Sequence, residues 1–528
     1  MAYKDKKYRA LEIIPGALVW ATLILVVIFS FTHPLWVVYF ILAFDLYWLF
    51  RVFHFVFYCV ISWRKYRAAR KIDWAKKVAE MEGSDEAAHL IFLPTYKESY
   101  EVVRETIKSL AGARYPAKKM IIVLAGEERD KENFTRIANS IGAEFAPVFM
   151  KFAVTVHPSG LPDEIPGKGS NLNFAGREVK PMVEALPIPE EKIIVSAFDI
   201  DTVVHPDYFS ALTVAYLSHP NPTRSSYQPI AFYNNNIWDS PAIVRIAAFG
   251  TTFWLMSELM RPERLVTFSS HSMSWKALKE VGFWQKDIVS EDSRIFLQCF
   301  MHYNGDYSAT PIHLPVSMDT VATERGYFES LKNLYKQHRR WAWGVENFPY
   351  LVWNFLRRPK IPLGKRIKYA WYDIEGRYTW ATAAIFISVL GRLPFYFAKG
   401  EVRELSLFQN APIILGWIMT AAMAGIFVSA ALMPFILVRR PKGKSVFSWL
   451  VMFLQWALLP LTLIVFGSLP AIDAQTRLML GKYLGFNVSP KTRGEVKQIA
   501  TRQNKIISMP SKRLLAAALS RFRGKYRF

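Results

Sequence analysis

Near the middle of the chain runs the stretch IIVSAFDID, residues 193–201. Its first six residues form a short, largely apolar run, which is typical of a fully buried strand in a parallel sheet. Asp199 and Asp201 follow directly, and residues i and i+2 of an extended chain face the same way. An isolated Asp-x-Asp is more often a turn or a cap. Because ligands of parallel sheets bind beyond the carboxyl ends of the strands, this position instead predicts a site where two carboxylates hold a hard divalent cation.

Short predicted strands and amphipathic stretches alternate over residues 85–358, and no segment there is apolar enough to span a membrane. Two further buried parallel strands are predicted at residues 89–93 and 120–124, and helical spacing occurs at 100–111 and 132–142. Strands that alternate with amphipathic helices indicate an α/β fold, with a nucleotide-binding sheet as the default.

Composition places this domain in a membrane protein. Of 528 residues, 52% are hydrophobic, 15% aromatic and 21% charged, and the mean hydropathy is +0.12. The net charge of +23 fits a nucleic-acid binder, a neighbour of anionic lipids, or loops that follow the positive-inside rule. The apolar segments favour the two membrane interpretations, so we expect membrane lipids and no nucleic acid as partners. Cys59 and Cys299 lack metal-ligand spacing and are expected to be buried thiols.

Apolar segments flank the α/β domain on both sides. Residues 1–71 contain two such runs between basic flanks, which predicts a transmembrane hairpin with both ends in the cytoplasm. The α/β domain, residues 85–345, then lies in the cytoplasm, followed by interfacial amphipathic helices over 346–377. We therefore expect a multi-pass protein of the cell membrane, inner or plasma, with a cytoplasmic catalytic domain.

Three more apolar segments lie within residues 378–470, and a basic tail follows over 471–528. The charge of the tail predicts that it is cytoplasmic. A complete crossing by the last apolar segment would place the tail outside. Pro460 and Pro470 favour a broken or re-entrant segment instead.

Residues that leave the predicted strands offer groups to a nucleotide. Thr95, Tyr96 and Glu98 follow the first strand, and Glu127 follows the second and could hold a base or ribose. Lys168 lies on a glycine-flanked stretch, which we expect to be a flexible turn suited to phosphate contacts. A proline turn, a solvated loop of charges and a plain surface loop would show the same residues.

Glu291 and Asp292 open a predicted helix over residues 293–300. Acids at this position favour the helix dipole, and Ser290 could cap the helix. The functional interpretation is that one of the two carboxylates removes the proton from an attacking hydroxyl.

Gln337, Arg340 and Trp341 are spaced i, i+3 and i+4, which predicts one helical face. The amide and the guanidinium could hold phosphate oxygens, while the indole stacks on a sugar ring. A basic, aromatic helix at a membrane interface would show the same pattern.

In this order, the motifs resemble those of the processive, membrane-integrated family 2 glycosyltransferases, which include cellulose, hyaluronan and chitin synthases. The resemblance covers most of the chain. It rests on the Asp-x-Asp, Glu-Asp and Gln-x-x-Arg-Trp motifs above, and the run from Lys168 to Asn173 is similar to the family's Lys-x-x-x-x-Asn segment. Gln228 to Asn234 is similar to another family strand.

Two further segments carry the resemblance. Ser270, His271 and Ser272 stand in the place of the family's acceptor motif, with Ser-His where the family has Cys-Gly. The run FNVSPK is similar to the gating loop of cellulose synthases, through Phe486, Val488, Ser489 and Lys491. Other departures are Glu127 where the family has Asp, and fewer spans after the domain.

The resemblance implies a GT-A catalytic domain that binds Mg²⁺ or Mn²⁺ through Asp199 and Asp201. It implies inverting transfer from a nucleotide sugar, expected to be a UDP-sugar, to a growing β-linked polysaccharide, with Asp292 as the base and Glu291 beside it. The alternatives are transfer of one sugar to a lipid acceptor and, from another class, a transporter or a membrane-anchored binding protein. The acids cluster in the aqueous domain and not within spans, which disfavours the transporter.

Overall fold

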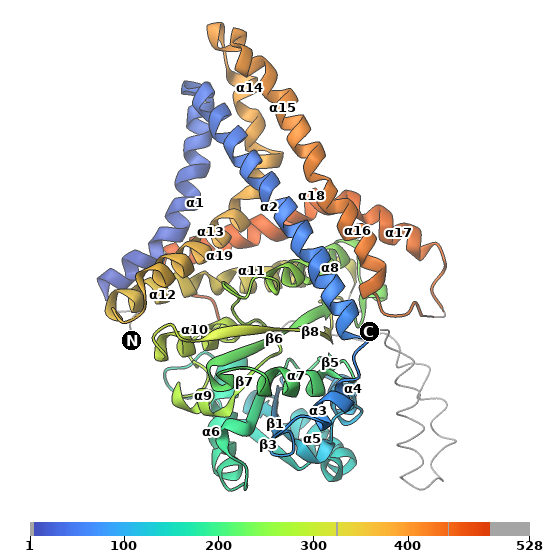
Figure 1. Ribbon diagram of the computed structural model, residues 1–528. Helices are drawn as coiled ribbons and strands as arrows, with labels where there is room; N and C mark the ends of the chain where they lie inside the picture. Colours follow the sequence, from blue (N-terminus) through green and yellow to red (C-terminus); the bar gives the residue numbers. More distant parts are fainter. Residues whose placement is uncertain (1–4, 324–325, 442, 486–528) are drawn as a thin grey trace.

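The computed structural model describes residues 5–323, 326–441 and 443–485. An eight-stranded sheet forms the centre of the α/β domain, in the order β3-β2-β1-β4-β7-β6-β8-β5 (Figure 1). The strands are β1 (Ala88–Pro94), β2 (Met120–Glu127), β3 (Lys151–His157), β4 (Ile193–Ala197), β5 (Val203–Val204), β6 (Ser225–Tyr233), β7 (His271–Ser274) and β8 (Ser308–Met318). β1 pairs in parallel with β2 and β4, while β7 is antiparallel to β4 and β6. The three predicted parallel strands are therefore confirmed within a mixed sheet.

The helices of this domain are α3 (Trp74–Ala79), α4 (Tyr100–Ala111), α5 (Lys131–Phe145), α6 (Lys168–Glu184), α7 (Tyr208–Leu217), α8 (Ala242–Glu258), α9 (Trp275–Glu280), α10 (Glu291–His302), α11 (Tyr327–Ala342) and α12 (Asn347–Arg357). Helices α4 to α9 pack on the sheet, and the other helices pack against neighbouring helices. β2 and β4 are buried at every residue, which explains why their sequences are nearly continuous apolar runs. The helices predicted at 100–111 and 132–142 correspond to α4 and α5.

The carboxyl ends of the central strands meet at one edge. Phe92 of β1 is in register with Val123 of β2 and Ala197 of β4. The residues that follow these three strands therefore leave the sheet side by side. This edge is where the sequence places its candidate ligand-binding residues.

Long apolar helices extend from the α/β domain (Figure 1). They are α1 (Lys6–Thr32), α2 (Pro34–Ala69), α13 (Leu363–Ser388), α14 (Leu393–Phe397), α15 (Ser406–Ala422), α16 (Ala424–Ile436), α17 (Ser448–Leu454), α18 (Leu459–Thr462) and α19 (Leu469–Met479). Within the described residues, four stretches are long and apolar enough to cross a membrane, and a fifth is the pair α13 and α14, bent by 46°. α1 and α2 form the expected helical hairpin. The predicted boundary at residue 377 is wrong as a structural break, because α13 runs through it as one helix.

The last apolar stretch, Ser448–Met479, has both of its ends against the α/β domain. Near its start, Lys444 Nζ lies 2.7 Å from Asp239 Oδ1. Near its end, Arg339 of α11 places Nη1 2.9 Å from Asp473 Oδ2. Figure 1 shows α17 to α19 running across the base of the upright apolar helices. The chain therefore enters and leaves this stretch on the side of the α/β domain.

Candidate active site

Lys168 lies among three carboxylates. Its Nζ is 2.6 Å from Asp199 Oδ1, 2.9 Å from each Oδ of Asp292 and 3.8 Å from Glu291 Oε1. Burial alone would lower the pKa of Lys168, but these carboxylates outweigh it and raise that pKa well above its usual value. Two motifs that are far apart in the sequence thus meet at one ammonium group.

The first turn of α6 carries Lys168, so the flexible turn predicted there is wrong. A glycine allows this helix to start against α10. A Cβ on Gly169 would lie 3.0 Å from Gln285 O and 3.2 Å from Glu291 Cβ, tighter than side chains normally pack. The close approach brings the lysine ammonium to the carboxylates of α10.

Asp199 and Asp201 differ in accessibility despite their i, i+2 spacing. The Asp199 side chain is 26% exposed, and its Oδ2 accepts a hydrogen bond from Ser269 Oγ at 2.7 Å. Asp201 is buried, and its Oδ2 accepts from the backbone N–H of Asp319 at 2.8 Å. Asp199 is therefore the carboxylate that the motif presents to a ligand.

The chemistry of the donor set fits a hard cation. Asp199 and Asp292 already share one positive charge, that of Lys168, and carboxylate oxygens are the ligands that Mg²⁺ prefers. In the part of the chain that the structure describes, no group of three or more His, Cys, Asp or Glu side chains is placed to hold a metal ion. A metal here would thus depend on ligands from outside the chain as well, such as substrate phosphates.

Glu291 and Asp292 occupy different environments although they are neighbours. α10 begins at Glu291 as predicted, with the Glu291 side chain 2% exposed and that of Asp292 21% exposed. Burial, reinforced by the charge of Asp292, raises the pKa of Glu291 to about 8. Glu291 Oε2 has no hydrogen-bond partner among the described residues. Burial thus favours the protonated form of Glu291, and the more exposed Asp292 is the carboxylate suited to accept a proton.

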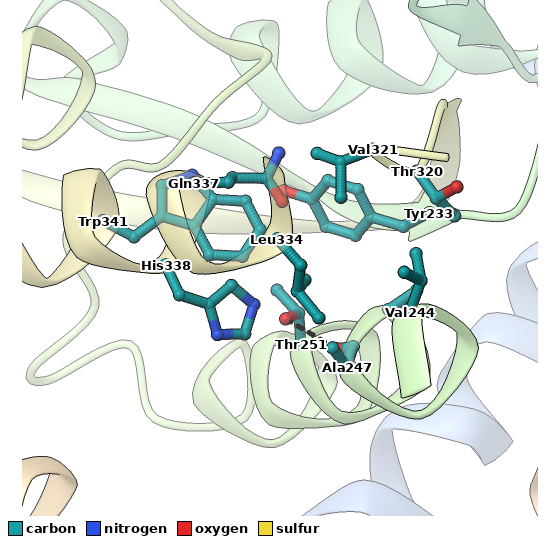
Figure 2. A pocket seen from close by; sticks show the side chains of 11 residues that line it. Tyr233, Val244, Ala247, Thr251, Thr320, Val321, Leu334, Gln337, His338 and Trp341 are labelled. Atoms are coloured by element: carbon teal, nitrogen blue, oxygen red, sulfur yellow. Dashed lines mark hydrogen bonds between the residues drawn. The ribbon is translucent and has the colours of Figure 1, made fainter. Parts of the chain in front are cut away.

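Gln337 and Trp341 line a pocket with Tyr233 (Figure 2). The pocket is narrow, with a volume of about 10 Å³, room for about one water molecule. The small side chains of Ala247 and Thr251 on α8 form its opposite wall. The Trp341 ring lies 5.8 Å from that of Tyr233. Burial and then the charges of Asp199, Asp201 and Asp292 raise the pKa of Tyr233, so the pocket adjoins the carboxylates.

Arg340 stands on the same helix as Gln337 and Trp341. Its positive charge partly opposes the rise in the pKa of Glu291, which is led by burial and Asp292. The structure therefore brings this motif, the Glu-Asp pair and the Asp-x-Asp motif into one region.

The predicted acceptor motif is mostly inside the sheet. Ser270 and Ser272 are buried, with hydroxyls 3.1 Å from Thr202 Oγ1 and 2.8 Å from Ser196 Oγ respectively. These two are not placed to contact an acceptor, because both hydroxyls are buried and bonded to other side chains of the domain. His271 is buried too, but its Nδ1 lies 3.7 Å from Asp292 Oδ1. Ser269, which the motif analysis did not select, holds Asp199.

The residues predicted to bind the nucleotide after β1 and β2 lie at the carboxyl edge of the sheet. Thr95 is buried, and its N–H donates to Ala125 O at 2.7 Å. Glu98 Oε2 accepts from the backbone N–H of Tyr96 at 2.5 Å. The Arg129 guanidinium stands 4.5 Å from the centre of the Tyr96 ring and donates from Nε to Glu127 Oε2 at 2.9 Å. Sequence reasoning missed Arg129, although its i+2 spacing from Glu127 is a usable signal.

Asn171 connects this edge to the carboxylates. It lies three residues after Lys168 on α6, hence on the same helical face, and its Nδ2 donates to Ala125 O at 2.9 Å. The predicted gating-loop residues Phe486, Val488, Ser489 and Lys491 lie outside the described residues.

The sequence profile of the family described as Glycosyl transferase family group 2 matches residues 194–469, more than half of the chain. The chain belongs to this family. This glycosyltransferase has the expected GT-A-like fold, with a curled mixed sheet and several apolar helices that could span a membrane.

One curated relative of this glycosyltransferase is the cellulose synthase 1 catalytic subunit [UDP-forming] of Komagataeibacter xylinus, 24% identical over 297 residues. The match covers 53% of this chain, which spans about a third (33%) of the length of the relative.

Two solved structures are similar to this glycosyltransferase. Mannosyltransferase PcManGT from Pyrobaculum calidifontis, in complex with GDP-Man and Mn²⁺, is 15% identical, with 71% of this chain and 99% of that chain covered and a TM-score of 0.36. S. aureus TarS 1-349, in complex with UDP-GlcNAc, is 10% identical, with 78% and 97% covered and a TM-score of 0.33.

Proposed function

We propose that this glycosyltransferase adds sugars from a UDP-sugar to the end of a growing β-linked polysaccharide. The observation that carries the proposal is the pair of contacts from Lys168 Nζ, at 2.6 Å to Asp199 and 2.9 Å to Asp292. These contacts join the motif suited to the donor phosphates to the carboxylate suited to the acceptor hydroxyl. The cellulose synthase relative is UDP-forming, which supports the donor class.

The donor is held from both of its ends. Tyr96 and Arg129 at the sheet edge offer an aromatic face and a guanidinium to the nucleoside, beside Glu127. Gln337 and Arg340, both on α11, would hold diphosphate oxygens. Asp199, supported by Asp201, would hold Mg²⁺ or Mn²⁺, which would supply positive charge to the departing diphosphate.

Asp292 acts as the base for the acceptor. The terminal sugar of the polymer stacks against Trp341, beside the narrow pocket, with one hydroxyl directed to Asp292. Asp292 takes the hydroxyl proton as the oxygen bonds to the anomeric carbon, and the bond from that carbon to the UDP oxygen breaks. A single displacement without a protein nucleophile inverts the anomeric configuration.

We place the enzyme in the cell membrane, inner or plasma, with the catalytic domain in the cytoplasm. α1, α2, the bent pair α13–α14 and the pair α15–α16 are four crossings, and Ser448–Met479 lies along the cytoplasmic surface. The contacts of Lys444 and Asp473 with the α/β domain support this path. Four crossings leave residues 480–485 on the side of the catalytic domain.

Transfer of one sugar to a lipid is the second candidate. The pocket favours it in one respect, since Val244, Val321 and Leu334 give it an apolar wall. The two candidates differ in product size after many turnovers. Purified enzyme in detergent is incubated with a panel of UDP-sugars, and released UDP and product size are measured together. A product limited to a lipid with one sugar at high donor concentration would overturn the polymer proposal.

Trp341→Ala tests the proposed acceptor platform in the same assay. Loss of the stacking surface should lower elongation more than hydrolysis of the donor, because Gln337 and Arg340 remain. Trp371→Ala is the matched control, since Trp371 is 61% exposed on α13. An equal fall of elongation and hydrolysis in Trp341→Ala would contradict the assignment.

A further inference from the structure

Glu346 binds the start of the helix that carries Glu291 and Asp292. It ends the short helix η8 (Trp343–Glu346) that follows α11. Glu346 Oε1 accepts hydrogen bonds from the backbone N–H groups of Val289 at 3.3 Å and Ser290 at 3.2 Å, and from Ser290 Oγ at 2.6 Å. The predicted cap by the Ser290 side chain is therefore wrong, because its hydroxyl donates to Glu346 and makes no cap bond.

This contact takes the place of a capping box, a common hydrogen-bond motif at the start of helices. In a capping box, a glutamate three residues into the helix accepts from the N–H of the N-cap residue. Here position three is Ser293, whose hydroxyl donates to Ser290 O at 3.2 Å, and the carboxylate comes from Glu346, on another element. The start of α10 is thus held by a residue that is remote in sequence.

Asn347, the residue after Glu346, adds further hydrogen bonds to the first turn of α10. Asn347 Oδ1 accepts from Arg294 Nε at 2.8 Å, and Asn347 Nδ2 donates to Ser293 Oγ at 2.9 Å. The main-chain oxygen of Glu346 accepts from Arg294 Nη2 at 3.1 Å. Bonds to Ser290, Ser293 and Arg294 fix the turn on both sides of Asp292.

The second carboxylate oxygen of Glu346 bonds to the segment that follows α11. Glu346 Oε2 accepts from Trp343 Nε1 at 2.9 Å, and Trp343 comes two residues after Trp341. We propose that Glu346 is a positioning residue that fixes Asp292 relative to the sugar-stacking residue Trp341. The inference rests on the base role of Asp292 in the proposed function.

The position of Asp292 on α10 relative to Trp341 on α11 matters because the reaction is sensitive to small displacements. A shift of about 1 Å in a positioned group can cost on the order of 10²-fold in rate. The carboxylate of Glu346 serves donors on both oxygens. In Glu346→Gln, the new NH₂ group would face either Trp343 Nε1–H or the donors of Ser290. Either the hydrogen bond to Trp343 or those to Ser290 must therefore break, although the residue keeps its size.

Glu346→Gln is the first variant, measured in the full-length enzyme with a UDP-sugar. We expect kcat for transfer to fall about 10- to 100-fold, while the Kd for UDP and the unfolding temperature stay near the wild-type values. Trp343→Phe removes the bond between Glu346 and the segment that follows α11, so its kcat should fall too, but less than that of Glu346→Gln because the bonds to Ser290 remain. Glu401→Gln, at an exposed residue of the short helix η10 (Gly400–Glu404), is the matched control.

A second measurement separates positioning from general stability. If Glu346 acts through Asp292, the variant that combines Glu346→Gln with Asp292→Asn should have the same residual rate as Asp292→Asn alone. Multiplied losses in the double variant, or wild-type kcat in Glu346→Gln, would overturn the inference and leave the proposed function standing. A parallel fall of kcat, UDP affinity and unfolding temperature would also overturn it. Near-normal transfer by Asp292→Asn would overturn the proposed function itself.

Discussion

Lys168→Met removes the ammonium group that lies between Asp199 and Asp292. Methionine has nearly the length of the lysine stem and fills the space without the charge. The carboxylates of Asp199 and Asp292, 26% and 21% exposed, would then face each other without that charge. We expect the variant to be less stable than wild type and to bind divalent cations more tightly in the absence of donor.

The size of the effect follows from the burial of Lys168. Removal of one partner from a buried ion cluster costs about 3–5 kcal/mol. In domains of about 150–250 residues, each kcal/mol moves the unfolding midpoint by about 2–4 °C. The midpoint of the catalytic domain should therefore fall by roughly 6–20 °C in chelator. Mn²⁺ should restore part of this loss, because it supplies the missing positive charge to the same carboxylates.

The assay is thermal unfolding of the detergent-solubilised enzyme, followed by tryptophan fluorescence with EDTA or with Mn²⁺. Lys180→Met is the matched control on the same helix, because the Lys180 side chain is 47% exposed and its pairing with Glu184 at 4.0 Å is a surface contact. Such surface pairs contribute about 0–1 kcal/mol. An unchanged midpoint for Lys168→Met in EDTA, or an equal Mn²⁺ response in variant and wild type, would refute the reasoning.

Three further predictions concern the base, its neighbour and the path of the chain. Asp292→Asn should lower transfer by about 10²- to 10⁴-fold with UDP binding retained, measured by product formation and by titration with UDP; near-normal transfer would remove Asp292 as the base. Because folding raises the pKa of Glu291 from 4.5 to about 8, its stabilising contribution is complete below pH 4.5 and is lost as pH rises to about 8. The midpoint of wild type relative to Glu291→Gln should fall across that range, and a constant difference would contradict the shift. Cysteines introduced at Lys482, Lys131 and Glu401 can be labelled in intact membrane vesicles with a thiol reagent. The cysteines at Lys482 and Lys131 should react from one face of the membrane and the cysteine at Glu401 from the other. Labelling at Lys482 from the same face as Glu401 would make the last apolar stretch a true crossing.

Local pattern was sufficient for most of the elements. The apolar run before Asp199 predicts β4, and the spacing of residues 100–111 predicts α4 to the residue. These segments were predictable because a buried parallel strand and an amphipathic helix each impose a short-range periodicity on the sequence. The Gln337 to Trp341 face was predictable for the same reason.

The roles within the site depend on contacts between remote residues. Sequence cannot separate Glu291 from Asp292, because both are carboxylates in the same helical turn, and only their burial does so. Lys168 was expected in a flexible turn because glycines flank it, whereas close packing of α6 against α10 makes that turn helical. Likewise, the polar contacts of Lys444 and Asp473 with the α/β domain, and not hydropathy, set the path of the last apolar stretch.

The amino-acid sequence by itself thus determined the elements, the sheet edge at which ligands bind and the motifs that gather there, since each is written in neighbouring residues. Only the tertiary structure decided how far each of the two carboxylates is exposed, which cation joins the motifs and which distant glutamate holds the start of α10. The reason is physical: burial, charge pairing and remote hydrogen bonds arise only when the elements pack together.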